Sequence, residues 1–158
     1  DWTSENLSQE LSFLGAELLI ETLELIKSGK VIRQPQVNAQ ASYAPLLKKD
    51  DGLINWKNTT ESIYNHIRGF YPWPGAYTFK DGREVKIWSA RKYESIQNVY
   101  APGSFLGVVK DQGFLVATGD GVLLVEELQV SGKNRIKALE YLAGHTIREG
   151  DLFADAAK

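Results

Sequence analysis

The chain has 158 residues, of which 43% are apolar and 24% are charged, and its formal net charge is −2. This length and composition are typical of one globular domain with or without an appended segment, and no apolar run reaches the ~18 residues of a membrane span. With no cysteine and only two distant histidines, the sequence excludes disulfides and thiolate metal sites and disfavours a histidine-rich metal site.

The charges are unevenly distributed along the chain. Residues 1–30 carry six acidic and two basic side chains, so residues 31–158 carry the remaining 14 acidic and 16 basic ones. This slight excess is far below that of a dedicated nucleic-acid-binding protein. Residues 1–10 lack a signal-peptide pattern, and we expect a cytoplasmic protein without a membrane segment. Because the sequence has no methionine and starts at Asp1, we also expect it to be part of something longer.

Residues 4–28 are predicted to form one long amphipathic helix. Thr3 is the expected cap, and Ser28-Gly29 marks the end. The helical period comes from apolar residues three and four apart, namely Leu7, Leu11, Leu14, Leu18, Leu19, Leu25 and Ile26. This stripe is typical of a helix packed on a sheet or core, and a partner-binding helix is the alternative.

Residues 31–45 have no sustained period and contain prolines and polar side chains, which predicts a linker between structural units. We therefore divide the chain into a terminal helix (1–30), a linker (31–45) and a domain (46–158). Lys48 and Lys49 begin a turn, and a short strand-like segment follows at residues 53–56.

The segment from Asn58 to Ser89 combines a helix, a proline-tryptophan corner and a hairpin. Asn58 and Glu61 fit a capping box for the helix, and residues 72–75 (Pro-Trp-Pro-Gly) end it. Asp81-Gly82 between two apolar runs predicts a tight hairpin. Its basic residues and interleaved aromatics are compatible with nucleic-acid binding, although alternation places about half of the aromatics in a core.

After a polar loop from Tyr93 to Tyr100, three further strands are predicted at residues 104–110, 114–118 and 122–129. Five short strands with a helix before and a helix after them (residues 137–143) favour a mainly β fold, a small barrel. The glycines of Gly119-Asp-Gly121 are typical of a turn rather than of a metal or phosphate loop. Residues 131–135 lack phosphate-loop spacing. The residues reveal no catalytic constellation and no metal cluster.

Several segments resemble the C-terminal part of the methionyl-tRNA formyltransferase family, in order and over essentially the whole chain. The most specific is residues 63–78, which read IYNHIRGFYPWPGAYT. The others are SYAP at 42–45, GLINW at 52–56, VATGDG at 116–121, Gln129 with Gly132-Lys133, and GDLF at 150–153. Residues 14–19 (LGAELL) with Thr22-Leu23 resemble the last helix of that family's N-terminal domain.

The resemblance implies an OB-like barrel that helps to hold initiator methionyl-tRNA during translation initiation. The parent enzyme transfers a formyl group from 10-formyltetrahydrofolate to the amino group of methionyl initiator tRNA. The resemblance places its folate site and its catalytic asparagine, histidine and aspartate in an N-terminal Rossmann-like domain with a Ser-Leu-Leu-Pro motif, which this sequence lacks. His66 and His145 match no catalytic position, so no catalytic, cofactor-binding or metal residue is assigned, and we expect this chain alone to be inactive.

In this interpretation eight basic residues are candidate phosphate contacts, namely Lys48, Lys49, Arg68, Arg83, Lys86, Arg91, Lys133 and Arg135. The expected partners are initiator methionyl-tRNA and the N-terminal catalytic domain, with self-association through residues 1–30 as another outcome. Two alternatives stay open. One is the equivalent subdomain of a 10-formyltetrahydrofolate dehydrogenase or hydrolase, or of a sugar formyltransferase. The other is a free-standing interaction barrel.

Overall fold

The computed structural model describes residues 2–93 and 100–154. The chain divides into two units, residues 1–47 and 48–158, and each is described by itself. The predicted polar loop at 93–100 lies mostly outside the described residues. Within them, no helix is long and apolar enough to cross a membrane.

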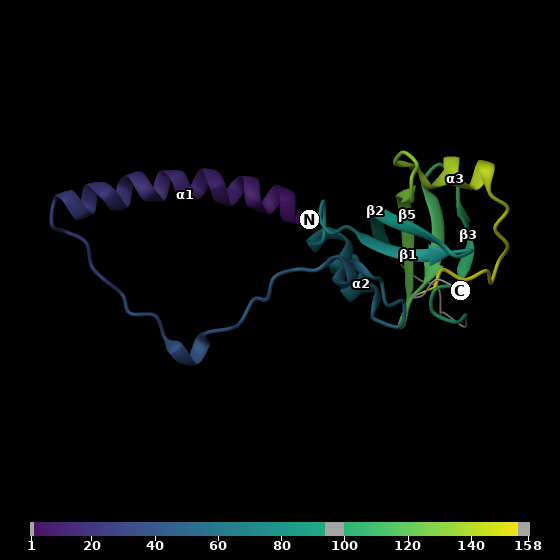
Figure 1. Cartoon of the computed structure of the whole chain (residues 1–158), viewed down its shortest axis with the longest axis horizontal. Helices are drawn as coiled ribbons and strands as arrows, with labels where there is room; N and C mark the ends of the chain where they lie inside the picture. Colours follow the sequence, from purple (N-terminus) through teal and green to yellow (C-terminus); the bar gives the residue numbers. More distant parts are fainter. Residues whose placement is uncertain (1, 94–99, 155–158) are drawn as a thin grey trace. The chain divides into compact units, whose positions relative to one another are not determined.

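The first unit is dominated by α1 (Ser4–Lys27), as the leucine period predicts (Figure 1). The helix buries none of its residues. Thr3 and Asn6 form a reciprocal capping box at its start. At its end, Gly29 has a φ of 69°, and the N–H groups of Gly29 and Lys30 donate to the carbonyls of Ile26 and Leu25. These two bonds satisfy carbonyls that the helix end leaves open. The only further element described before Leu47 is η1 (Asn38–Gln40).

The second unit is a mainly β fold, as predicted. It begins with η2 (Lys49–Gly52) and α2 (Thr60–Gly69) and contains α3 (Ala138–Gly144). All described strand pairs are antiparallel, and the sheet order is β1-β2-β5-β4-β3, with β6 also paired to β5. The strands are β1 (Ala76–Lys80), β2 (Arg83–Tyr93), β3 (Phe105–Val109), β4 (Gly113–Ala117), β5 (Val122–Val130) and β6 (Ile136–Lys137).

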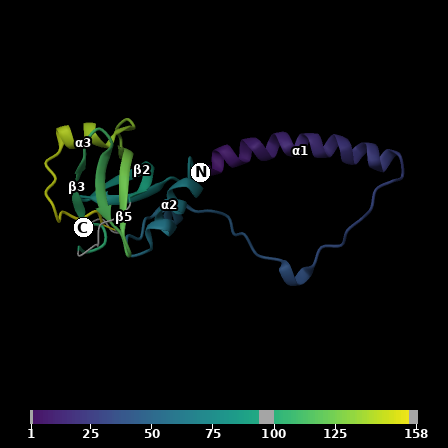
Figure 2. The ribbon, with the colours of Figure 1, turned by 180° about the vertical axis from the view of Figure 1, so that it is seen from behind.

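Residues 150–154 complete the sheet by joining its two outer strands. Phe79 of β1 exchanges two backbone hydrogen bonds with Ala154, at 2.9 and 2.8 Å, and Phe105 of β3 donates to Asp151 at 2.8 Å. Phe153 lies between these contacts, buried against Phe114 and Trp56. The ribbon therefore curls into a small barrel, seen from opposite sides in Figures 1 and 2.

The core confirms the alternation read from the sequence. In β2, Val85 and Ile87 are each 1% exposed, whereas Lys86 and Trp88 between and after them are only partly buried. The turn at Asp81-Gly82 has positive φ at both residues, 51° and 74°, which gives the predicted tight hairpin its twist. Residues on alternate sides of β2 therefore belong to two environments, the barrel interior and an outer surface.

Two expectations are wrong in detail. Residues 53–56 make only one isolated bridge, Leu53 to Tyr77, instead of a strand, although Ile54 and Trp56 are buried in the core. The five predicted strands are joined by β6, whose two residues are too few to give a period in the sequence. The helix cap is Thr59, one residue after the expected Asn58.

The start of α2 is held by the Gly119-Asp-Gly121 turn, 60 residues away in sequence. One carboxylate oxygen of Asp120 accepts from the backbone N–H of Thr60 at 2.7 Å and from its hydroxyl at 3.0 Å. Gly119 approaches so closely that a Cβ there would lie 2.1 Å from the carbonyl oxygen of Lys57. The turn predicted from these glycines is confirmed, and it also anchors a helix to the barrel.

Candidate nucleic-acid interface

An aromatic and cationic cluster lies on the outer side of the barrel around Trp88. The edge of Tyr71 meets the Trp88 ring with centroids 5.6 Å apart and an interplanar angle of 84°. The guanidinium of Arg135 lies 5.6 Å from the Trp88 centroid, and the ammonium of Lys86 lies 5.4 Å from it. We call this cluster, completed by two residues described next, the Trp88 surface: Tyr71, Lys86, Trp88, Gln129, Lys133 and Arg135.

Strand pairing brings these residues together. Lys86 of β2 lies directly opposite Gln129 of β5. The Gln129 amide accepts from the Trp88 indole at 3.0 Å and donates to the backbone carbonyl of Lys133 at 2.7 Å. One side chain therefore fixes both the indole ring and the loop that carries Lys133, and Lys133 is exposed.

Arg135 is held in place without losing its charge. Its Nε donates to Glu127 at 2.7 Å, a second guanidinium nitrogen forms an ion pair with the same carboxylate, and a third donates to the Tyr71 hydroxyl at 3.4 Å. Partial burial opposes the charged form, but the hydrogen bonds to Tyr71 and Glu127 outweigh it and raise the pKa of Arg135. The residue is therefore cationic at every physiological pH.

Lys86 supports the proline-tryptophan corner. Its ammonium donates to the carbonyl of Pro74 at 3.1 Å and lies 5.4 Å from the centroid of the Trp88 ring. Lys86 thus combines a structural bond with a positive charge at the surface.

Lys49 reaches the same strand from η2. Its ammonium lies 3.3 Å from the Glu84 carboxylate, and Glu84 precedes Lys86 by two residues on the outward side of β2. Lys48 is exposed, and its backbone N–H donates to the Asp51 carboxylate at 2.7 Å, which fixes the turn. The paired lysines therefore sit in a structured turn, with Lys49 partly neutralised.

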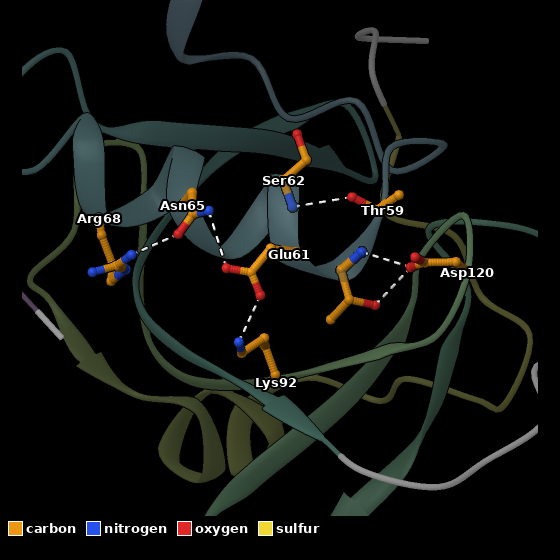
Figure 3. A network of polar contacts seen from close by, with 8 residues as sticks. Thr59, Glu61, Ser62, Asn65, Arg68, Lys92 and Asp120 are labelled. Carbon is orange, nitrogen blue, oxygen red and sulfur yellow. Dashed lines mark hydrogen bonds and ion pairs between the residues drawn. The ribbon is translucent and has the colours of Figure 1, made fainter.

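Arg68 belongs to a different network on α2 (Figure 3). Its guanidinium covers the Tyr64 ring at 4.6 Å and donates to Asn65 at 2.5 Å. Asn65 donates in turn to Glu61, which also accepts from Lys92 at 2.6 Å. The hydrogen bond from Lys92 is the main cause that lowers the pKa of Glu61. Glu61 partly neutralises the two cations of this network, and Arg68 is tied to Tyr64 and Asn65 on α2.

Arg91 and Arg83 also lie apart from the Trp88 surface. Arg91 follows the β-bulge of β2 and pairs with Glu126 at 2.5 Å and with Gln112 at 3.0 Å. Arg83 is exposed at the start of β2, beside the hairpin turn. Of the eight predicted cations, the structure joins Lys86, Lys133 and Arg135, brings Lys49 to their border with exposed Lys48 next to it in the chain, and separates Arg68, Arg83 and Arg91. A role of any of them in binding RNA stays a prediction.

Two features of this interface escaped the sequence reading. Tyr71 and Gln129 position the cations, yet neither carries a local signal, because each acts across 17 or more residues (Tyr71–Trp88 and Trp88–Gln129). His66 is a packing residue: its ring lies 4.3 Å from Phe70, and its Nε2 lies 3.2 Å from the Gly52 carbonyl oxygen. Burial lowers the pKa of His66. Among the described residues no group of three or more His, Cys, Asp or Glu could hold a metal ion.

Comparison with known proteins gives a family match for the sequence and a similar fold for the structure. Residues 46–146 match the family described as "Formyl transferase, C-terminal domain". The methionyl-tRNA formyltransferase of Geobacter sulfurreducens is 40% identical over 156 residues, 99% of this chain and 48% of that protein. That of Geobacter metallireducens is 43% identical over 150 residues, 95% of this chain and 47% of that protein.

Among solved structures, HypX from Aquifex aeolicus has a similar fold. It superposes with a TM-score of 0.62 at 20% identity, over 81% of this chain and 22% of that one. Identity this low shows the fold alone. The chain spans about half the length of the curated relatives it matches, and the match is to their C-terminal part.

The closed antiparallel sheet and its outer aromatic surface place residues 48–158 in the class of OB-like barrel domains. The family match covers more than half of the sequence. The chain belongs to the formyl transferase C-terminal domain family, as its resemblance to methionyl-tRNA formyltransferases predicted.

Proposed function

We propose that the barrel is the tRNA-binding part of a cytoplasmic methionyl-tRNA formyltransferase, and that it contacts initiator methionyl-tRNA through the Trp88 surface. The observation that carries this proposal is the position of Lys86, Lys133 and Arg135 around the partly buried aromatic side chains of Tyr71 and Trp88. Cations attract the phosphate backbone without reading sequence, and aromatic side chains add contacts to ribose and base. In this proposal the surface positions the methionyl-tRNA that receives the formyl group and takes no part in the chemical step.

The chemical step belongs to the parent enzyme in this proposal. That enzyme moves a formyl group from 10-formyltetrahydrofolate to the methionyl amino group, which requires a proton acceptor close to the attacking nitrogen. Among the described residues, both histidines have structural contacts: His66 packs on Phe70, and Nδ1 of His145 donates to the Tyr141 carbonyl at 2.9 Å. We predict no turnover by the 158-residue chain, and a formylation assay with methionyl-tRNA and 10-formyltetrahydrofolate tests this.

We further propose that α1 packs against the catalytic domain of the parent enzyme. The helix leaves its apolar side chains exposed, with Leu11, Leu14 and Leu18 at 56%, 59% and 63%. A stripe of this size marks an interaction surface. Sedimentation of the chain distinguishes this partner from a second copy of the chain. A monomer that binds the separately expressed catalytic domain supports the proposal. A dimer that is lost in Leu14→Lys assigns the stripe to self-association.

The RNA-binding proposal is tested by fluorescence anisotropy with labelled initiator tRNA. We expect weak binding at 50 mM salt that falls steeply by 200 mM, because each neutralised phosphate releases counterions. Absence of binding at 50 mM salt, or binding unchanged between the two concentrations, would contradict the phosphate-contact proposal. The former result would favour the alternative of a barrel that serves only the geometry of a folate or sugar enzyme.

A matched pair of variants assigns the binding to one surface. Lys133→Gln and Lys110→Gln each remove one exposed positive charge, but only Lys133 belongs to the Trp88 surface. We expect Lys133→Gln to weaken tRNA binding about threefold or more and to lower the salt slope by about 1. Equal effects of both variants would show that net charge matters and that the surface does not.

A further inference from the structure

The proline-tryptophan corner presents its tryptophan to solvent. Trp73 is 60% exposed, the highest fraction of any large apolar side chain described in residues 48–158, whereas Trp56 of the same unit is 3% exposed. An isolated exposed side chain needs no special explanation. The backbone around Trp73, however, is fixed by several contacts, and this fixed conformation does need an explanation.

The corner is held on both sides of Trp73. Pro72 and Pro74 restrict the φ angles of the positions that flank it. Pro74 and Gly75 are buried, the Gly75 N–H donates to the Phe70 carbonyl at 2.9 Å, and the Pro74 carbonyl accepts from Lys86. Gly75 has a φ of 79°, a backbone angle that residues other than glycine rarely adopt. Trp73 thus exposes its indole to solvent while its backbone is conformationally restricted.

The surroundings of the corner are cationic. Lys86 bonds to the residue that follows Trp73, and Tyr71, two residues before Trp73, contacts Arg135 through its hydroxyl and its ring. A rigid tryptophan loses little conformational entropy when it is covered, which is why tryptophan is frequent among residues that dominate binding. The cations at its borders select a polyanion over an apolar protein surface.

We propose that Trp73 stacks on an unpaired base of the bound RNA while Lys86, Lys133 and Arg135 neutralise the phosphates beside it. The inference rests on the proposed function and adds to it a stacking residue and a requirement for an unpaired nucleotide. Stacking tolerates any base, because every base has a π face. A fully paired helix offers only its terminal pairs, so the contribution of Trp73 is specific to RNA with unpaired residues.

The test measures binding of the full chain to labelled initiator tRNA and to a blunt RNA duplex of similar length. We expect Trp73→Ala to weaken tRNA binding about tenfold or more, and to change duplex binding less than about twofold. Trp73→Phe keeps an aromatic face and should recover most of the affinity. Trp2→Ala is the matched control, because Trp2 is 55% exposed in the other unit. Thermal unfolding of each variant confirms that the barrel is intact.

Fluorescence gives a second readout. Stacking on a base quenches an indole, so tRNA should quench the wild-type emission more than that of Trp73→Phe. Wild-type affinity in Trp73→Ala, or an equal loss on tRNA and duplex, would overturn the stacking inference while leaving the proposed function in place. No tRNA binding by the wild-type chain would overturn both. The two failures are therefore distinguishable.

Discussion

Helices α1 and α2 are both amphipathic, yet they are stabilised in opposite ways. α1 has 24 residues, buries none of them, and takes its caps from residues next to it in sequence. α2 has 10 residues, buries Ile63, Tyr64 and Ile67, and is anchored by Asp120 from a distant turn. A helix of ten residues is marginal in isolation, whereas 24 residues with good caps can persist alone. α1 is therefore local structure, and α2 exists because the barrel exists.

The largest expected effect sharpens this contrast in the core. Ile63→Ala removes a side chain that is 2% exposed between α2 and the barrel, so the free energy of unfolding should fall by about 2–5 kcal/mol. Leu14→Ala in α1, 59% exposed, should change the unfolding of the barrel by less than about 0.5 kcal/mol. Urea titration followed by tryptophan fluorescence measures both. Comparable losses in the two variants would show that the units unfold together.

The caps provide a smaller effect. Asp120→Ala leaves the first N–H of α2 without its carboxylate and should lower the stability of the barrel by about 1–2 kcal/mol. Asp120→Asn keeps an acceptor oxygen and should lose less. Thr3→Ala removes the cap of α1 and should reduce helicity in far-ultraviolet circular dichroism without moving the barrel transition. A shifted barrel transition in Thr3→Ala would contradict the independence of the two helices.

The smallest effect concerns pH. Burial lowers the pKa of His66 below its usual value, so the unfolded chain binds a proton more readily than the folded one. Its contribution therefore reduces stability as pH falls through the ordinary histidine pKa of about 6.5, and it has no effect above neutrality. Melting temperatures between pH 7.5 and 5.5 should fall more in the wild type than in His66→Gln. Parallel curves would show that carboxylates, rather than His66, cause the loss.

The elements that the sequence predicts best are those specified by neighbours in the chain. The long helix with its Thr3 cap, the Asp81-Gly82 hairpin and the Gly119-Asp-Gly121 turn all rest on local conformational preferences, and all are confirmed. The start of α2 was placed one residue early because Asn58 and Thr59 both fit a cap. The choice between them is made by packing. The Asn58 carbonyl accepts a hydrogen bond from the Gly119 N–H, and the Thr59 hydroxyl accepts one from the Ser62 N–H.

The interface was less predictable, because the sequence shows which residues are charged, but only the fold determines which of them lie close together. The eight cations could be named in advance. That Lys86 and Arg135 share one indole depends on the pairing of β2 with β5 and on the position of β6 beside them. The carboxylates of Glu126 and Glu127 partly neutralise Arg91 and Arg135. These ion pairs could be identified only once the strand pairing was known.

The five residues from 150 to 154 have a consequence for the solution behaviour of the chain. By bonding to Phe79 and Phe105 they occupy backbone groups on the two outer strands, which would otherwise be templates for strands of other molecules. A version shortened to residue 149 should therefore aggregate as well as lose the Phe153 contact with the core. This short tail acts as the barrel's own protection against intermolecular strand addition.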